Sequence, residues 1–168
     1  MAQTNIRVLA LDLDGTLTND KKIVTPRTRA ALDAAAAQGV TIVLASGRPT
    51  AGITPLAREL GLDKKGGCVL AYNGGKIVDC VTGGTLYQVQ LPAEYVPQLC
   101  AFAAEQDVAI LTYNTEGIVC ERDRDEWANK ECFTTKLPMI HVDDLASYVD
   151  YPVCKMLITL DPARRDEV

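Results

Sequence analysis

The sequence predicts an α/β fold in which a parallel sheet is followed by a second unit of mixed α+β structure. Three short apolar runs, rich in branched residues, lie in the first half of the chain and are typical of strands covered on both faces. Helix-like segments separate these runs, an order that indicates parallel strands joined by right-handed crossovers. After Asn73 the pattern changes to short paired strands and further helices, which indicates an α+β unit.

The first half contains three predicted strands and two predicted helices. The strands are residues 6–11 (IRVLAL), 40–45 (VTIVLA) and 68–72 (CVLAY). One helix is expected from Pro26 towards Gly39, because Thr25 is a good N-cap and proline is favoured in a first turn. The second helix is expected over residues 50–60, since Gly61 follows as a stop signal.

The second half begins with a predicted hairpin. Residues 76–80 and 85–90 flank the turn sequence Thr82-Gly83-Gly84. The elements expected after it are a helix at 92–106, paired strands near 108–114 and 117–122, a polar helical stretch near 125–131 and a strand at 153–160. We therefore predict one domain at residues 1–82 and an α+β domain at residues 83–168.

The composition favours a globular chain. It has 168 residues, of which 48% are hydrophobic and 23% charged, enough for one domain with part of another. The net charge of -5 and the lack of a basic stripe argue against a nucleic-acid partner. The basic pairs Lys21-Lys22, Lys64-Lys65 and Arg164-Arg165 are interpreted as solvated faces. No apolar stretch approaches the ~20 residues of a membrane helix, and no apolar leader precedes the first strand, so we expect a cytoplasmic protein.

The cysteines and the histidine give no sign of a metal site. Six cysteines are spread along the chain without a Cys-x-x-Cys pair, whereas zinc sites need closer clustering. Most lie in apolar segments, where a reduced cysteine acts as a small hydrophobic residue, so we expect no disulfide framework. His141 is the only histidine, and we expect it in a loop without a functional role.

Polar side chains follow each of the three predicted parallel strands. Asp12, Ser46 and Asn73 come at these strand ends, and ligands of open parallel sheets bind beyond the carboxyl ends of the strands. Such residues also serve as turn formers and helix caps, but three together at one edge favour a binding site. No Walker or dinucleotide-binding glycine motif occurs.

The segment at residues 12–17, Asp-Leu-Asp-Gly-Thr-Leu, resembles the first motif of the haloacid dehalogenase-like phosphatases. Residues 45–48 (ASGR) resemble the second motif of that superfamily, and with residues 72–75 (YNGG) the chain is similar to its Cof-type branch. The resemblance implies a Rossmann-like core, here with only its first three strands, and an inserted α+β cap domain.

The resemblance implies a magnesium-dependent phosphatase that acts on a small phosphorylated metabolite, such as a sugar phosphate monoester. A carboxylate can attack a phosphoryl group and form an aspartyl-phosphate, and this is the role implied for Asp12. Asp14 would act as general acid and base, with mutual repulsion separating the two pKa values. Mg²⁺, a hard cation that takes oxygen ligands, would bind the Asp12 carboxylate and the Asp14 backbone carbonyl.

The remaining site residues follow from the same resemblance. Phosphate binding is expected at Leu13, Ser46 and Gly47, and substrate binding at Arg48, Asn73 and Gly74. Arg48 can either face the substrate or pair with a surface acid, and the sequence leaves both open.

The family's later lysine and its Gly-Asp-x-x-x-Asp segment have no match in the sequence, and Lys155 does not fit the position of that lysine. Asp161-Pro162 predicts a helix start with few residues after it. We therefore expect the N-terminal part of a capped phosphatase, inactive alone, with one edge of the strand at 6–11 unpaired and open to self-association. The alternative function is a non-catalytic phosphate- or metal-binding module, although pure binding would not need Asp14.

Overall fold

A computed structural model describes residues 6–168 and divides the chain into two compact units, the first ending at Gln88 and the second running from Val89 to Val168. Residues 1–5 lie outside the described residues. The prediction that no apolar leader precedes the first strand depends on these residues. No helix among the described residues is both long and apolar enough to span a membrane.

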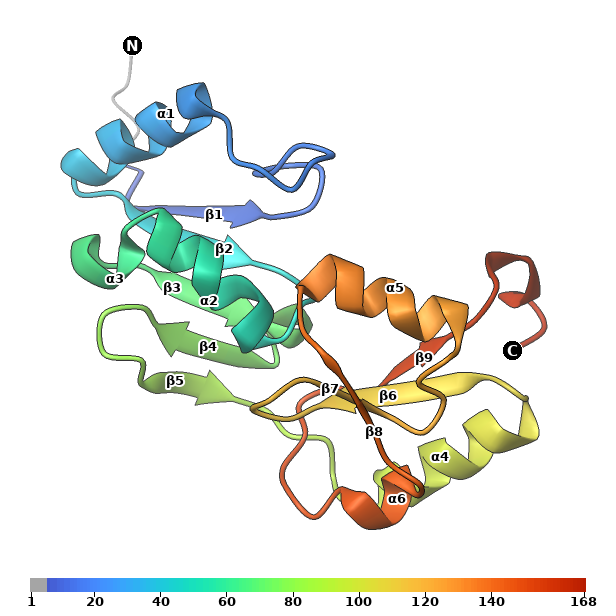
Figure 1. The fold of residues 1–168 in the computed structure, drawn as a ribbon. Coiled ribbons are helices and arrows are strands. Elements are labelled where there is room, and N and C mark those ends of the chain that lie inside the picture. The colour runs from blue at the N-terminus through green and yellow to red at the C-terminus, as the bar shows by residue number, and fades with distance from the viewer. Residues whose placement is uncertain (1–5) are drawn as a thin grey trace. The chain divides into compact units, whose positions relative to one another are not determined.

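The first unit is built on a five-stranded sheet with the order β1-β2-β3-β4-β5. β1, β2 and β3 run parallel, β4 runs antiparallel to β3, and β5 runs antiparallel to β4 (Figure 1). The predicted α/β class, with three parallel strands, is therefore confirmed. The strands are β1 (Val8–Asp12), β2 (Thr41–Ala45), β3 (Cys68–Ala71), β4 (Lys76–Asp79) and β5 (Thr85–Gln88).

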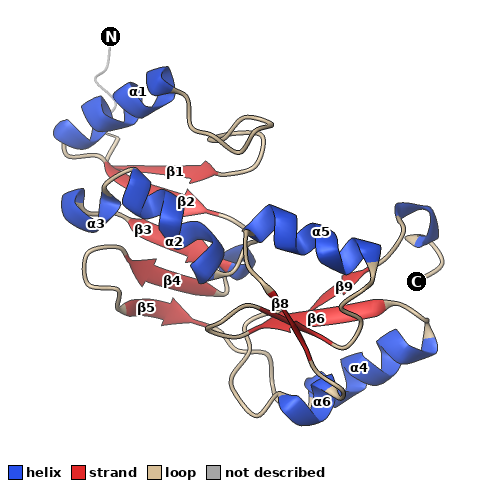
Figure 2. Cartoon of the chain, in the orientation of Figure 1, coloured by secondary structure: helices blue, strands red, loops and turns tan. Residues whose placement is uncertain are grey.

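The helices of the first unit alternate with its parallel strands, as Figure 2 shows by colour. They are α1 (Pro26–Ala37), α2 (Thr50–Glu59), α3 (Leu62–Lys65) and the 3-10 turn η1 (Tyr72–Gly74). The predicted N-cap of α1 is confirmed, because the Thr25 hydroxyl accepts a hydrogen bond from the Thr28 backbone N–H at 3.2 Å. The four-residue helix α3 was not predicted, since it is too short to carry a periodic pattern.

β1 differs from the prediction in one respect. A strand covered on both faces was expected, but the residues of β1 alternate between exposed and half-buried, and Val8 is 57% exposed. The reason is its place in the sheet: among the described residues β1 pairs only with β2 and forms the sheet edge. The predicted unpaired edge is thus present.

The second unit contains a four-stranded sheet with the order β8-β7-β6-β9. Its two interior strands, β7 and β6, are buried along their whole length. The strands are β6 (Ala109–Tyr113), β7 (Ile118–Cys120), β8 (Met139–His141) and β9 (Leu157–Thr159). The helices are α4 (Tyr95–Glu105), α5 (Glu126–Thr135), α6 (Leu145–Tyr148) and the 3-10 turn η2 (Pro162–Arg164). The predicted pairing of β6 with β7 is confirmed as antiparallel.

Two short elements of the second unit, β8 and α6, were not predicted from the sequence. β8 pairs parallel with β7, and this pairing places His141 at the end of a strand rather than in a loop. α6 follows directly and begins at an N-cap, where the Asp144 carboxylate accepts a hydrogen bond from the Ser147 N–H at 2.9 Å. Elements of three or four residues depend on their neighbours more than on local sequence, so pattern reading misses them.

Candidate active site

The register of the parallel strands brings the predicted site residues to one edge of the first sheet. Asp12 pairs with Ala45, and Ala45 pairs with Leu70. Ser46 follows Ala45 directly, and Asn73 lies in η1 just after β3. This shared edge is the arrangement predicted from the strand ends.

The turn after β1 is closed by its own hydrogen bonds. The Leu17 N–H donates to the Asp12 carbonyl at 3.1 Å, and both the backbone N–H and the hydroxyl of Thr18 donate to the Leu13 carbonyl, at 2.9 and 2.8 Å. Gly15 has a φ of +79°, which a residue with a Cβ rarely adopts. Leu13 is buried whereas Asp12 and Asp14 are exposed, so the turn anchors an apolar side chain between two accessible carboxylates.

Two cations hold the Asp14 carboxylate. Arg48 Nη2 and Lys22 Nζ both donate to Oδ1, at 2.6 and 2.7 Å, and Arg48 Nε donates to Oδ2 at 3.1 Å. Arg48 comes from the loop after β2 and is only 8% exposed. Its buried guanidinium needs an anionic partner, because an unpaired buried charge is strongly unfavourable. In the structure Arg48 pairs with an acid, and that acid is Asp14.

Lys22 is the residue of this site that the sequence analysis missed. Lys21 and Lys22 were interpreted as a solvated face, but the Lys22 ammonium lies 2.7 Å from Asp14 Oδ1. A signal was present in the sequence, since a lysine eight residues after Asp14 follows a turn-forming Asn-Asp pair. Only the folded turn shows that the lysine side chain points back to the acid.

The surroundings of Asp14 lower its pKa. Partial burial raises the pKa of this carboxyl, but the hydrogen bonds and the charges of Arg48 and Lys22 together outweigh that effect. The cations set the direction, whereas the sequence analysis attributed the separation of the pKa values to repulsion from Asp12. Asp14 is therefore an ionised carboxylate at neutral pH, the form that accepts a proton.

The loop after β2 is fastened to the turn after β3. The Asn73 N–H donates to the Ser46 carbonyl at 3.2 Å, and the Tyr72 N–H donates to the Arg48 carbonyl at 3.0 Å. The Ser46 hydroxyl accepts a hydrogen bond from the Arg48 N–H at 3.2 Å. These bonds fix both segments at the edge that carries Asp12.

The loop after β2 and the turn η1 approach each other closely at Gly47. A Cβ on Gly47 would lie 3.1 Å from the Asn73 side-chain oxygen, so the position suits glycine. Tyr72, Asn73 and Gly74 all have positive φ values, of 53°, 56° and 97°. Such a run is unfavourable for residues with a Cβ, and backbone strain of this kind gathers at functional sites.

The oxygen donors at this edge fit a magnesium ion in kind. Mg²⁺ in proteins takes one or two carboxylates and keeps several waters. The Asp12 carboxylate is exposed, and the backbone carbonyl of Asp14 is the donor implied by the resemblance. Over residues 6–168 no group of three or more His, Cys, Asp or Glu side chains could hold a metal. The described residues thus offer part of a coordination sphere.

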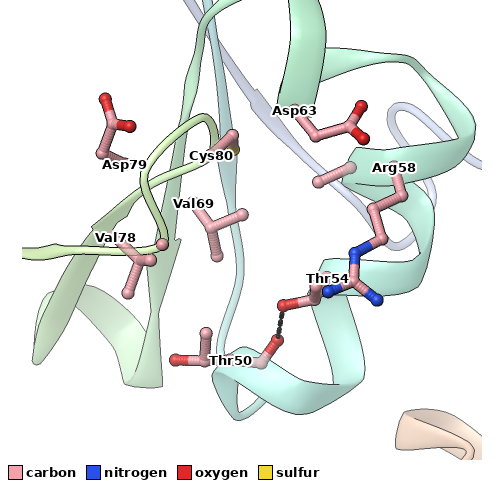
Figure 3. A pocket seen from close by; sticks show the side chains of 10 residues that line it. Thr50, Thr54, Arg58, Asp63, Val69, Val78, Asp79 and Cys80 are labelled. Carbon is pink, nitrogen blue, oxygen red and sulfur yellow. Dashed lines mark hydrogen bonds between the residues drawn. The ribbon is translucent and has the colours of Figure 1, made fainter.

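A cavity of about 210 Å³ lies beside α2, away from the acid pair. Figure 3 shows Thr50, Thr54 and Arg58 on the helix across from Val69 and Val78 on the strands. None of the predicted site residues lines it. This cavity was not predicted from the sequence, because it lies between a helix and a hairpin that come together only in the folded chain.

Comparison with known proteins identifies the family. A model of the haloacid dehalogenase-like hydrolases matches residues 9–168. The chain belongs to this family. The resemblance inferred from residues 12–17, 45–48 and 72–75 is therefore confirmed.

Individual relatives agree with this assignment. YxeH of Bacillus subtilis, a predicted phosphatase, is 33% identical over 134 residues, which make up 79% of this chain and 50% of YxeH. The pyridoxal phosphate phosphatase YbhA of Escherichia coli is 32% identical over 115 residues, or 68% of this chain and 41% of YbhA. A haloacid dehalogenase-like hydrolase from Bacteroides thetaiotaomicron superposes with a TM-score of 0.90 at 41% identity, covering 96% of this chain and 61% of that one. The chain thus spans half or less of these two curated relatives.

Proposed function

We propose that the protein is a magnesium-dependent phosphatase that hydrolyses a small phosphate monoester through an aspartyl-phosphate. The observation that carries this proposal is the placement of Asp12 and Asp14 at the carboxyl end of β1, beside the buried Ser46 that follows β2. Membership of the haloacid dehalogenase-like hydrolases supports the same chemistry.

Asp12 is the proposed nucleophile. One of its carboxylate oxygens attacks phosphorus, the bond from phosphorus to the ester oxygen breaks, and Asp14 supplies the proton that the leaving oxygen takes up. In the second half-reaction Asp14 accepts a proton from water, which attacks phosphorus and releases phosphate and the free Asp12 carboxylate. Asp14 must therefore be protonated for the first step and ionised for the second, and its lowered pKa favours the second.

The phosphoryl group is proposed to contact the Ser46 hydroxyl and the backbone of Leu13 and Gly47. These groups are hydrogen-bond donors on preorganised turns, the arrangement that stabilises developing charge. Substrate contacts are proposed for Arg48, Asn73 and Gly74. Because the Arg48 guanidinium is held by Asp14, a direct contact with substrate requires release of part of that pair.

Mg²⁺ is the proposed cofactor, held by the Asp12 carboxylate and the Asp14 backbone carbonyl. When bound, it neutralises charge on the phosphoryl oxygens. The described residues supply few ligands for it, so we propose that the 168-residue chain is inactive by itself and that activity belongs to the full-length gene product.

The proposed substrate is a small phosphorylated metabolite similar to a sugar phosphate. The name of the relative YbhA gives it pyridoxal phosphate as substrate, which is also a small phosphate monoester. Residues 83–168 are proposed to be part of a cap domain that selects this substrate. No nucleic-acid or membrane partner is proposed for this acidic chain. Its location is proposed to be cytoplasmic. The open edge of β1 is a proposed site of self-association.

Hydrolysis of p-nitrophenyl phosphate by the full-length gene product tests this function. We expect turnover with Mg²⁺ and its loss when the metal is removed by a chelator. Binding of inorganic phosphate without any turnover would instead support the non-catalytic binding module. Absence of both turnover and phosphate binding would contradict both functions.

A further inference from the structure

We propose that Lys22 is a positioning residue that holds one oxygen of the Asp14 carboxylate and leaves the other free for proton transfer. This inference rests on the proposed role of Asp14 as the acid–base group. Lys22 would touch neither substrate nor metal, and would act only through Asp14.

The contacts of the two carboxylate oxygens are unequal. Oδ1 accepts two short bonds, from Lys22 Nζ at 2.7 Å and from Arg48 Nη2 at 2.6 Å. Within residues 6–168, Oδ2 accepts one longer bond, from Arg48 Nε at 3.1 Å. A carboxylate oxygen has two lone pairs, so both lone pairs of Oδ1 are used and one lone pair of Oδ2 remains. Oδ2 is therefore the oxygen that can exchange a proton with the leaving group or with water.

Lys22 creates this asymmetry. Arg48 alone would bind both oxygens with its planar fork, one nitrogen to each. The added ammonium on Oδ1 distinguishes the oxygens and fixes the rotation of the carboxyl group. The Lys22 and Asp14 side chains are 25% and 35% exposed, and ion pairs this accessible contribute little to folding stability. Stability alone therefore does not account for the pair.

The backbone around Lys22 is built to aim its side chain. Lys22 has a φ of +59°, a conformation that is unfavourable for a residue with a Cβ. Asn19 maintains it, because its side-chain oxygen accepts hydrogen bonds from the N–H groups of Lys21 and Ile23, at 3.0 and 3.1 Å, and its carbonyl accepts one from Lys22 at 2.8 Å. A strained residue in a closed turn is typical of a functional position.

The neighbouring Lys21 provides a matched control. It has the same charge and lies in the same turn, and within residues 6–168 its exposed ammonium makes no ion pair. Replacing it removes an identical charge from the same loop without touching Asp14.

The first experiment compares Lys22→Met, Lys22→Arg and Lys21→Met in the full-length gene product with p-nitrophenyl phosphate and Mg²⁺. We expect Lys22→Met to lower kcat roughly tenfold, the loss for one charge-assisted hydrogen bond to a catalytic group, with KM within about twofold. Lys22→Arg should recover most of the loss, and Lys21→Met should match the wild type. A rise in KM with kcat unchanged would show that Lys22 binds substrate, which contradicts the proposal.

A double-mutant cycle tests whether Lys22 acts through Asp14. In the Asp14→Asn background, Lys22→Met should change kcat by less than about twofold, because neighbours in one network are not additive. A full tenfold loss in that background would overturn the proposal.

A readout without catalysis separates this inference from the proposed function. The side-chain ammonium signals of lysines are followed by nitrogen-15 NMR in the wild type and in Asp14→Asn. We expect the Lys22 signal to shift and the Lys21 signal to stay. A full-length protein without phosphatase activity contradicts the proposed function, whereas an unmoved Lys22 signal contradicts the Lys22–Asp14 coupling whatever the activity.

Discussion

The two units of the chain differ in one respect among their buried polar side chains: within the described residues, only the first unit buries a charged side chain, that of Arg48. In the second unit, the Thr112 hydroxyl donates to the Lys155 carbonyl at 2.9 Å and the Thr135 hydroxyl donates to the Glu131 carbonyl at 2.7 Å. Both are neutral groups satisfied by backbone, an arrangement that supports the fold. In the first unit, the buried Arg48 is instead satisfied by the carboxylate of Asp14, which is partly open to solvent.

Under the proposed function, this difference separates a site of proton transfer from contacts that support the fold. A threonine hydroxyl does not ionise at neutral pH, whereas a carboxyl group can release and take up a proton. Substitutions at the acid-bearing edge of the first sheet should therefore alter activity more than stability. Substitutions in the core of the second sheet should do the reverse.

The largest expected effect is that of Asp12→Asn in the full-length gene product. Turnover should be abolished, because an amide cannot form the aspartyl-phosphate, and trapping of beryllium fluoride on this residue should be lost. The melting temperature should stay close to that of the wild type, because Asp12 is exposed. Asp20→Asn, in an exposed position of the loop after β1, is the control, and near-full activity of Asp12→Asn would remove the nucleophile assignment.

Asp14→Asn should have the next largest effect. We expect a loss in kcat of roughly 10²–10⁴-fold, the usual contribution of general acid–base catalysis. The measurement is steady-state hydrolysis of p-nitrophenyl phosphate, with Asp20→Asn again as control. A loss smaller than about tenfold would show that another group carries the proton.

A matched pair of strand substitutions compares the two sheets directly. Leu111 in β6 is fully buried, whereas Val8 in β1 is 57% exposed. Leu111→Ala should lower the free energy of unfolding by about 2–5 kcal/mol, and Val8→Ala by less than about 1 kcal/mol. Unfolding in urea is followed by far-ultraviolet circular dichroism, which reports both units, and by the fluorescence of Trp127 in α5, the only tryptophan, which reports the second unit. Equal effects of the two substitutions would contradict the observed burial.

The smallest expected effect is on the pH dependence of stability. The pKa of Asp14 is lower in the folded chain than in the unfolded chain. The pair with Arg48 and Lys22 therefore stabilises the fold above the unfolded pKa, near 4, and this contribution is lost as the pH falls through the folded pKa. The stability difference between wild type and Asp14→Asn should shrink as the pH is lowered from about 5 to about 2, as measured by urea unfolding. A difference that stays constant over this range would show that the pair is not formed in solution.

Much of the first unit could be predicted because its signals are local. The apolar runs, the Thr25 cap and the polar residues at the strand ends each depend on a few neighbouring residues, and the structure places all of them close to the expected positions. The short elements α3, β8 and α6 could not be predicted in this way. Three or four residues are too few to show a periodic pattern, and contacts with neighbouring elements decide whether they form.

The family and the edge of the sheet that carries Asp12, Ser46 and Asn73 follow from the sequence alone, because motif and strand end are adjacent along the chain. Which charged side chains meet depends on the folded chain. Asp14 and Arg48 are 34 residues apart, and they are brought together by the parallel pairing of β1 with β2. Lys22 reaches the same carboxylate through a left-handed turn. The burial of β1 likewise depends on its place at the sheet edge. An apolar run looks the same in the sequence whether the strand has one neighbouring strand in the sheet or two.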